Sequence, residues 1–193
     1  MTSRSEYRLI LRQDNADARL TPIGRKIGLI SDERYRLFEE KQKKLSEEIL
    51  RLKKTFIPPD ETLLSLLEQK QSSPVKCGVS LADLLRRPEL SYADLALVDH
   101  KRPVLPKTIT ETAEVEIRYE GYIKRQLAQV EQFKKLEKKL LPTAFDYNEI
   151  KGLRLEARQK LNQQKPESIG RASRISGVSP ADISVLLIYF HYV

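Results

Sequence analysis

The amino-acid sequence predicts an all-α protein, and three observations support this fold class. Two long segments carry apolar residues at alternating steps of three and four, which places those residues on one face of a helix. Short Ser-x-x-Asp motifs, whose serine caps a helix start, recur between and after these segments. Strand-like alternation is nowhere sustained. We expect a long antiparallel helical pair with an inserted set of short helices, followed by a small C-terminal helical subdomain.

The first long helix is expected to start after Ser31, a favourable N-cap residue, and to end before Pro58 and Pro59. Its apolar stripe has Gln42 in one slot and otherwise consists of Tyr35, Phe38, Leu45, Ile49, Leu52 and Phe56. This spacing is typical of a helix that packs along another helix.

The second long helix is expected to start at a capping box, Thr108 to Glu111, and to stop at Pro142. Its stripe consists of Tyr119, Ile123, Gln126, Val130, Phe133 and Leu140. Gly121 lies inside this helix, where glycine costs about 1 kcal/mol relative to alanine. We favour close packing of another helix over that position, and the alternative is the approach of a ligand.

Shorter helices fill the rest of the chain. Ser80, Ser91 and Ser179 each begin a Ser-x-x-Asp helix start. After Pro142 we expect four short helices at 147–150, 155–161, 169–175 and 181–190. The predicted parts are an Arg-rich junction at 1–30, the long-helix pair at 31–142 with its insert at 58–107, and the C-terminal subdomain at 143–193.

Composition excludes several classes of protein. A single cysteine, Cys77, rules out an internal disulfide framework and a thiolate zinc cluster. The longest apolar run, 183–190, is too short to cross a bilayer, and charged residues at the start do not resemble a signal peptide. We therefore expect a cytoplasmic protein without a membrane partner.

The net charge of +8 is concentrated at the two ends of the chain. Residues 1–28 carry six basic and three acidic groups, and residues 151–193 carry seven basic and three acidic groups. Arg4, Arg8 and Arg12 repeat every four residues, so they would share one helical face. This cluster fits either a phosphate-binding surface or a solvated face paired with neighbouring carboxylates.

No catalytic motif accompanies these features. Gly-rich phosphate loops and the G-x-S-x-G elbow are both missing from the sequence. Cys77 and His100 lack any supporting motif for a nucleophile–base pair. The sequence therefore argues against a self-contained enzyme, and we expect no catalytic, cofactor-binding or metal-binding residue in it.

Residues 168–187 have the spacing of a DNA-binding helix-turn-helix, with Gly177 at the turn and Ile183 at an apolar position. The second helix, however, offers no Arg, Lys, Asn or Gln to read base edges. We expect it to be buried in its own subdomain or against a partner.

Several long motifs resemble the C-terminal region of the MnmG/GidA family of tRNA uridine 5-carboxymethylaminomethyl modification enzymes. They are Thr2 to Leu9, Leu11 to Asp17, Arg19 to Thr21, Asp83 to Glu89, Tyr119 to Gln126 and Ile169 to Val178. The resemblance covers nearly the whole chain. One departure is Arg171, where the family usually has Gln.

The resemblance implies functions that the residues alone do not show. Members of this family bind FAD through an N-terminal domain, use NADH and work with a GTPase called MnmE to modify the wobble uridine of tRNA. The implied role of this chain is a C-terminal module that binds tRNA and the GTPase, in a parent protein expected to be a homodimer. FAD and NADH would belong to the parent, and residues 1–30 would join this module to its FAD domain.

The expected sites follow from charge and from this resemblance. The expected tRNA-binding residues are Arg4, Arg8, Arg12, Arg19 and Arg125. The expected partner-binding residues are Gly170, Arg171, Arg174, Gly177, Ile183 and Leu187. Two alternatives stay open: a purely structural docking or dimerisation module without RNA contact, and a helix-turn-helix DNA-binding protein.

Overall fold

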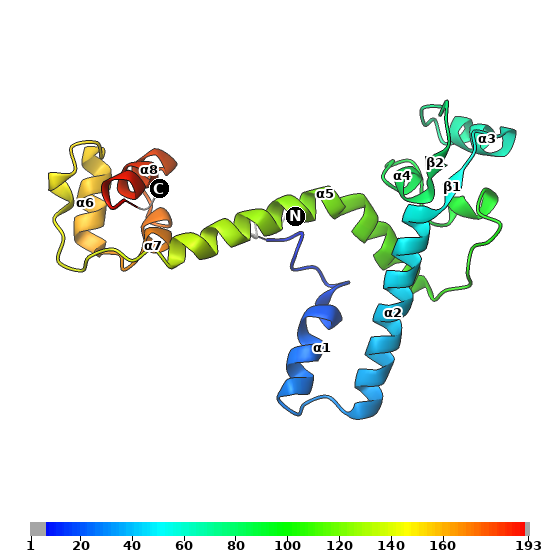
Figure 1. Cartoon of the computed structure of the whole chain (residues 1–193), viewed down its shortest axis with the longest axis horizontal. Coiled ribbons are helices and arrows are strands. Elements are labelled where there is room, and N and C mark those ends of the chain that lie inside the picture. Colours follow the sequence, from blue (N-terminus) through cyan, green and yellow to red (C-terminus); the bar gives the residue numbers. More distant parts are fainter. Residues whose placement is uncertain (1–6, 192–193) are drawn as a thin grey trace. The chain divides into compact units, whose positions relative to one another are not determined.

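The structure is a computed structural model that describes residues 7–191, and nearly all of its regular secondary structure is helical (Figure 1). The chain forms two compact units, Met1–Lys124 and Arg125–Val193. Helix α5 (Lys107–Glu137) begins in the first unit and ends in the second. The predicted all-α class is confirmed. The division falls inside α5, whereas the sequence places it after Pro142.

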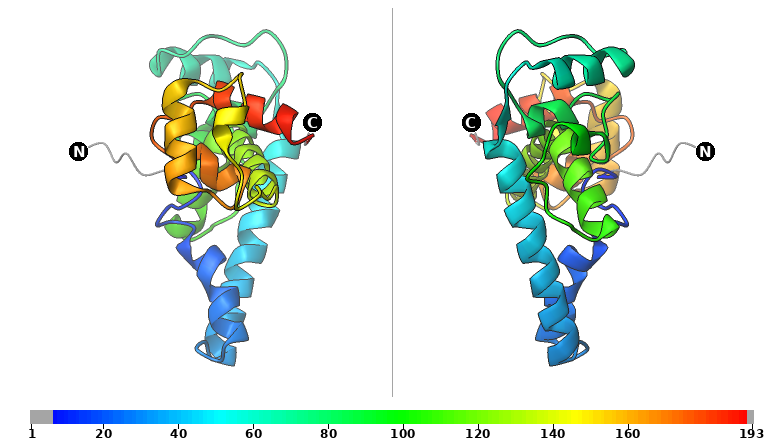
Figure 2. Two further views of the ribbon diagram at one scale, coloured as in Figure 1. Left: turned by 90° about the vertical axis from the view of Figure 1, so that its left-hand side faces the viewer. Right: turned by 90° about the vertical axis from the view of Figure 1, so that its right-hand side faces the viewer.

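The first unit opens with a helical hairpin. Helix α1 (Ala16–Lys26) and helix α2 (Asp32–Lys54) pack on each other, and Figures 1 and 2 show the chain folding back between them. Gly28 supports this turn with a φ of +78°, a conformation that glycine adopts without steric cost. The Ser31 hydroxyl accepts a hydrogen bond from the Arg34 amide, which confirms the predicted N-cap of α2.

Short elements follow α2, as the sequence predicts. They are β1 (Phe56–Ile57), α3 (Glu61–Gln69), β2 (Val79–Ser80), α4 (Leu81–Leu85) and the 3-10 helix η1 (Asp94–Leu97). Asp60 and Ser80 cap α3 and α4 by accepting hydrogen bonds from backbone amides. The two strands pair antiparallel with Phe56 opposite Ser80, and this two-residue ladder is a small departure from the all-helical expectation.

The core of the first unit joins α2, the short elements and the first turns of α5. Leu45 and Leu52 of α2 are buried, as the predicted stripe requires. On α5 the buried apolar residues are Ile109, Ala113 and Ile117, which form a row of steps of four. The predicted α5 stripe is wrong, because Tyr119, Phe133 and Leu140 are exposed and other positions face the core.

Two further expectations for the long helices need correction. The antiparallel pair does not run along both helices, because α2 packs mainly on α1 and α4. It meets α5 in the shared core and through the ion pair of Lys53 with Glu120 at 2.6 Å. The capping box at Thr108 does not form. The helix starts one residue earlier, at Lys107, so Thr108 lies in its first turn and its carbonyl accepts the Thr112 hydroxyl at 2.7 Å.

The second unit is a small helical bundle that follows the end of α5. It contains the 3-10 helix η2 (Tyr147–Glu149), α6 (Leu155–Gln164), α7 (Ile169–Ser173) and α8 (Pro180–Tyr189). The four predicted short helices are therefore confirmed. Ser168 caps α7, and Ser179 forms a full capping box with Asp182 at the start of α8. Leu161, Ile169 and Leu186 lie fully buried in the bundle core.

Candidate functional site

The Arg-rich start does not form the predicted helical face. Arg4 lies outside the described residues. Residues 7–10 form a turn, and α1 starts only at Ala16. Arg8 and Arg12 therefore do not share a helical face, and the four-residue spacing has no structural meaning here.

Arg12 and Arg19 bind other parts of the chain. The Arg12 guanidinium donates to Asp14 at 3.0 Å, to Glu116 of α5 at 3.3 Å and to the Leu9 carbonyl at 2.6 Å. Its side chain is only 13% exposed. Arg19 donates to the Asn15 side chain at 3.0 Å and to the Arg12 carbonyl at 3.2 Å. These two arginines hold the start of the first unit together.

Arg8 and Arg125 are the exposed members of the predicted tRNA-binding set. They belong to different compact units, so each has to be considered with its own surroundings. Of the four described members, Arg8, Arg12 and Arg19 lie in the first unit and Arg125 in the second, so no single unit holds them all.

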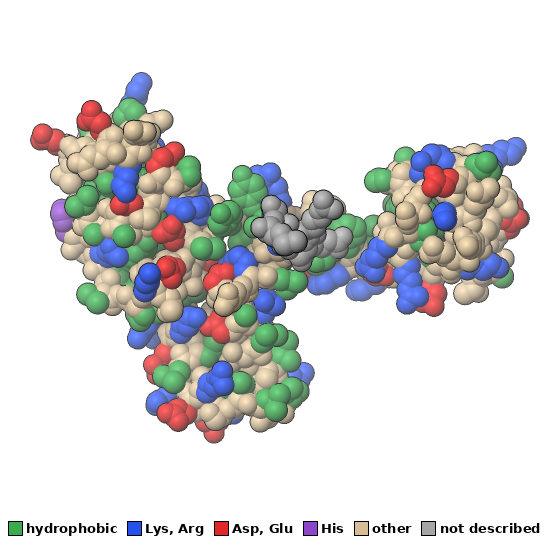
Figure 3. All heavy atoms as spheres, turned by 180° about the vertical axis from the view of Figure 1, so that it is seen from behind, with side chains coloured by type: hydrophobic (Ala, Val, Ile, Leu, Met, Phe, Trp, Pro, Cys, Tyr) green, Lys and Arg blue, Asp and Glu red, His purple; other side chains and the backbone are tan. Residues whose placement is uncertain are grey.

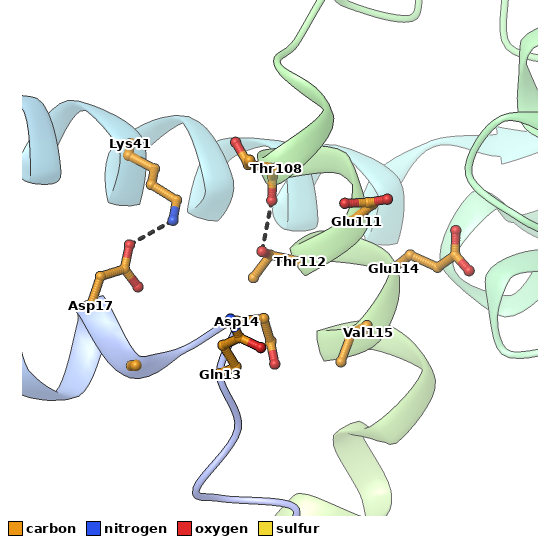
Figure 4. Close-up of a pocket in the computed structure, with 10 residues that line it drawn as sticks. Gln13, Asp14, Asp17, Lys41, Thr108, Glu111, Thr112, Glu114 and Val115 are labelled. Atoms are coloured by element: carbon orange, nitrogen blue, oxygen red, sulfur yellow. Dashed lines mark hydrogen bonds and ion pairs between the residues drawn. The ribbon is translucent and has the colours of Figure 1, made fainter.

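An open hollow of about 960 Å³ lies beside Arg12, between the start of α1, α2 and the start of α5 (Figure 4). Four carboxylates and one lysine line it, and they are Asp14, Asp17, Glu111, Glu114 and Lys41. Asp17 pairs with Lys41 at 2.5 Å, and the Glu114 carboxylate accepts the Tyr92 amide at 2.7 Å. The other carboxylates also have basic partners, since Asp14 pairs with Arg12, Glu111 with Lys107 at 3.5 Å and Glu114 with Arg118 at 3.0 Å.

Within the described part of the chain, no group of three or more His, Cys, Asp or Glu residues is placed to hold a metal ion. None of the helices described has both the length and the apolar content needed to cross a bilayer. Cys77 is exposed and lies in the loop before β2.

The second unit carries more uncompensated positive charge than the first. Residues 125–193 contain twelve Lys and Arg residues against seven Asp and Glu residues, a net charge of +5. Residues 1–124 contain the other twenty-three Lys and Arg residues and the other twenty Asp and Glu residues, a net charge of +3. The bundle is also the smaller unit, so its charge is more concentrated. Figure 3 shows Lys and Arg side chains on several sides of it.

Five lysines of the second unit make no ion pair among residues 7–191. These residues, named the bundle lysines, are Lys135, Lys138, Lys151, Lys160 and Lys165. The other cations of the unit include residues with a carboxylate partner, such as Lys134 with Glu131 at 2.8 Å. Unpaired lysines keep their full charge for a polyanion, so within the second unit the bundle lysines are the candidate phosphate ligands.

The predicted partner-binding residues divide into buried and exposed groups. Gly170 and Ile183 are buried inside the bundle, and Leu187 is half-buried. A Cβ at Gly170 would lie 2.6 Å from Cδ of Glu137, so glycine is required there for packing.

Gly177 likewise serves the fold of the bundle. It has a φ of +96°, and a Cβ there would lie 2.6 Å from Oε1 of Glu156. Arg171 and Arg174 have exposed side chains, but they pair with Glu167 at 3.1 Å and with Glu137 at 2.5 Å. Of the predicted set, these two arginines can still reach a partner.

Helix α8 is only partly buried within its own bundle, so the burial of its other apolar residues against a partner stays a prediction. Ile183 and Leu186 face the bundle core, while Ile188 and Tyr189 are 65% and 42% exposed. The exposed positions include no Arg, Lys, Asn or Gln, so α8 lacks the groups that read base edges in a DNA groove. An exposed apolar end is more typical of a protein contact.

Sequence reasoning missed the bundle lysines as candidate ligands. The signal was the basic excess at residues 151–193, but Lys135 and Lys138 fit equally well as favourable charges at the end of a long helix. Which lysines find a carboxylate partner depends on the tertiary packing.

Comparison with known proteins assigns the chain to a family. Residues 32–127 match the model of the tRNA modifying enzyme MnmG/GidA C-terminal helical domain. Residues 129–192 match the model of the MnmG/GidA C-terminal helical bundle. Together the two matches leave only the first 31 residues and two single positions outside them.

Individual relatives agree with this assignment. The tRNA uridine 5-carboxymethylaminomethyl modification enzyme MnmG of Caldicellulosiruptor saccharolyticus is 62% identical over 189 residues, which is 98% of this chain and 30% of that protein. MnmG of Lachnoclostridium phytofermentans is 54% identical over all 193 residues, which is 31% of that protein. The chain thus spans about a third of the length of these relatives.

Solved structures show the same relationship. GidA of Aquifex aeolicus, in its form II crystal, superposes on this chain with a TM-score of 0.65 at 35% identity. The match covers 98% of this chain and 29% of the GidA chain. The form I crystal gives a TM-score of 0.61. The chain therefore belongs to the MnmG/GidA family and corresponds to its C-terminal helical region.

Proposed function

We propose that this chain is the C-terminal tRNA- and partner-binding module of an FAD- and NADH-dependent enzyme. With an MnmE-type GTPase, that enzyme would install the carboxymethylaminomethyl group on carbon 5 of the wobble uridine of tRNA. Family membership and the printed function of its relatives support this proposal. In this proposal FAD and NADH bind elsewhere in a cytoplasmic, homodimeric parent protein, and the module by itself carries out no redox chemistry.

The observation that carries the RNA part is the set of five bundle lysines. Each lysine that neutralises a phosphate releases a condensed counterion, which favours binding and makes it salt-dependent. A paired cation contributes less, because its carboxylate must first be displaced. The second unit has the greater net charge, +5 against +3, on fewer residues, which favours it over the first unit as the RNA surface.

The predicted arginines keep different roles in this proposal. Arg8 and Arg125 are exposed and stay candidates for additional phosphate contacts. Arg12 and Arg19 position the start of the chain through their internal hydrogen bonds. Arg4 stays a prediction from sequence alone.

The proposed binding of a protein partner is supported by the outer surface of the bundle. Ile188 and Tyr189 offer an exposed apolar end of α8, and Arg171 and Arg174 offer exposed cations on the same unit. Gly170, Gly177, Ile183 and Leu187 would support this surface from within the bundle. Apolar anchors with a charged rim are typical of protein interfaces.

The second candidate function is a purely structural docking module without RNA contact. The exposed apolar end of α8 favours it independently of charge. The two candidates differ in one expected property, since only the first predicts that the isolated chain prefers tRNA to other polyanions.

A titration of fluorescently labelled tRNA with this chain tests the proposal. Binding is measured at two salt concentrations, with an unrelated DNA duplex as competitor. The proposal predicts salt-sensitive binding that the duplex displaces poorly. Equal competition by tRNA and duplex would contradict the RNA part and leave the docking candidate.

A further inference from the structure

Helix α1 presents its apolar face to solvent. Leu20, Ile23 and Ile27 follow the spacing i, i+3 and i+7, which places them on one side of the helix. Their exposed fractions are 58%, 59% and 64%, and α1 contains no buried residue. Leu29, directly after α1, is 75% exposed. We call Leu20, Ile23 and Ile27 the α1 apolar face.

The side of α1 that faces the rest of the hairpin is polar or small. Asp17 pairs with Lys41 of α2 at 2.5 Å. At Gly24 an added Cβ would lie 3.0 Å from Cγ1 of Ile30, so the helix and the following loop approach closely there. A helix normally turns its apolar side toward its packing partner. In this chain α1 does the opposite, and its apolar face has no partner among the described residues.

The surroundings of this face are typical of an interface. Arg25 forms an ion pair with Asp32 and donates to the Ile30 carbonyl, and Lys26 is exposed beside it. Apolar side chains bordered by polar and charged groups are the usual arrangement of a docking surface. Figure 3 shows hydrophobic side chains gathered at the lower end of the α1–α2 hairpin.

The comparisons indicate what covers this face. The first family model starts at residue 32, so α1 lies outside the C-terminal helical domain that it describes. The Lachnoclostridium relative nevertheless aligns over all 193 residues, α1 included, and is about three times as long. Helix α1 therefore belongs to the family sequence but not to its C-terminal helical domain, which points to the remaining two thirds of the protein as its packing partner.

We propose that the α1 apolar face docks into an apolar groove on the part of an MnmG-type polypeptide that this chain does not contain. The hairpin of α1 and α2 would then fix the C-terminal module to the rest of the enzyme. This inference rests on family membership and is independent of RNA binding and of the GTPase.

A binding experiment with two separate polypeptides, this chain and the remaining part of a relative, tests the proposal. The chain is labelled with a fluorophore at Cys77, which is exposed and is its single cysteine. It is titrated with MnmG of Caldicellulosiruptor saccharolyticus truncated before the region that matches this chain. We expect Ile23→Asp with Ile27→Asp to weaken binding roughly 10-fold or more, because two charges would enter an apolar groove.

Leu97→Asp is the matched control, since Leu97 is 55% exposed in η1, outside the α1–α2 hairpin. It should leave the affinity within about twofold. Equal affinities of the double variant and the control would overturn the proposal. Self-association of the unmodified chain that the double variant abolishes would also overturn it, because the occupant would then be a second copy.

Hydrogen exchange keeps the proposal testable if the truncated relative does not fold. The peptide covering α1 is compared between the isolated chain and the full-length Caldicellulosiruptor enzyme. Docking predicts clearly slower exchange in the full-length enzyme. Equally fast exchange in both proteins would contradict it.

Discussion

The guanidinium of Arg12 donates to the Glu116 carboxylate at 3.3 Å, and this contact joins the start of the chain to helix α5. Arg12 also binds Asp14 and the Leu9 carbonyl, so every part of its charged group has a partner within the first unit. A residue that resembles a phosphate ligand in the sequence thus has a structural role. The proposed RNA surface therefore rests on cations without such partners among the described residues.

Replacement of Arg12 by alanine should lower stability without lowering RNA affinity. The variant loses a largely buried guanidinium and leaves Glu116 without this partner, which costs about 1–2 kcal/mol of unfolding free energy. Chemical denaturation and tRNA titration measure the two properties. Arg8→Ala serves as the control, because Arg8 is exposed and its loss should not change stability. A loss of tRNA affinity with unchanged stability in Arg12→Ala would contradict the structural role.

A buried polar network in the first unit should be sensitive to the charge of Glu48. This carboxylate is 2% exposed and binds Arg51 at 2.8 Å and the Tyr92 hydroxyl at 2.7 Å. Glu48→Gln should cost about 2–4 kcal/mol, because Arg51 loses one of its two acidic partners in a buried place. Glu47→Gln, one position away on the solvent side, should change stability by less than about 0.5 kcal/mol.

The ionisation of Tyr92 gives a second measurement of this network. Burial, together with the hydrogen bond to Glu48, raises the pKa of Tyr92 to about 12. In an NMR titration this tyrosine should stay protonated near pH 11, where exposed tyrosines have already lost most of their protons. Titration of Tyr92 together with the exposed tyrosines would show that the network does not form in solution.

The stability of the bundle should fall at acidic pH through Asp182. The Arg154 guanidinium donates to this carboxylate at 2.7 Å and holds the pKa of Asp182 well below its usual range, although burial opposes the shift. Because the folded-state pKa is lowered, the carboxylate stabilises the fold above the unfolded-state pKa of about 3.9. That contribution is lost as the pH drops below this value toward the folded-state pKa.

Thermal melts of the unmodified chain and of Asp182→Asn, recorded between pH 7 and pH 2.5, measure this effect. The variant should be less stable at pH 7 by about 1–3 kcal/mol and should lose less stability on acidification. Identical loss of stability on acidification in both proteins would show that other carboxylates cause the acid sensitivity.

Replacement by alanine should raise the stability of the chain at Gly121 and lower it at Gly170. A Cβ at Gly121 meets no atom within 4 Å, so Gly121→Ala should stabilise helix α5 by about 1 kcal/mol. The packing role that we favour from the sequence is therefore wrong for this chain. Gly170→Ala should destabilise the bundle by about 1–2 kcal/mol, because it displaces Glu137 from Ser168 and Arg174. Thermal denaturation measures both, and a loss of stability in Gly121→Ala would contradict the open surroundings.

Local signals predicted much of the fold. Ser31, Ser80 and Ser179 cap helices because a serine hydroxyl needs only the next three residues to form its hydrogen bond. The stripe on α2 is confirmed in part, since Leu45 and Leu52 lie in the core, whereas Phe56 falls in β1 and is 66% exposed. The arrangement of α5 was not predictable in the same way. Its two apolar rows compete, and only the packing of the unit decides that the row containing Ile117 is buried.

The candidate site was less accessible to sequence reasoning. An arginine has the same local sequence whether it binds phosphate or a distant carboxylate, and Glu116 lies 104 positions from Arg12. The burial of Ile183 beside the exposure of Ile188 depends likewise on which face of α8 meets the bundle. Charge excess in the sequence points to both ends of the chain, and only the structure shows which lysines of the second unit lack a carboxylate partner among the described residues.

One comparison of tRNA affinities tests the central claim most directly. The lysine variant has glutamine at the four exposed bundle lysines, which are Lys135, Lys138, Lys151 and Lys165. The arginine variant carries Arg8→Gln and Arg19→Gln. Both variants are titrated with tRNA at several salt concentrations. We predict that the lysine variant loses affinity and that its salt dependence falls by about 0.7–0.9 for each phosphate contact removed. The arginine variant should lose less affinity than the lysine variant, because Arg19 binds within the chain and only Arg8 stays a candidate for a phosphate contact. Unchanged affinity and salt dependence in the lysine variant would contradict the assignment of RNA binding to the C-terminal bundle.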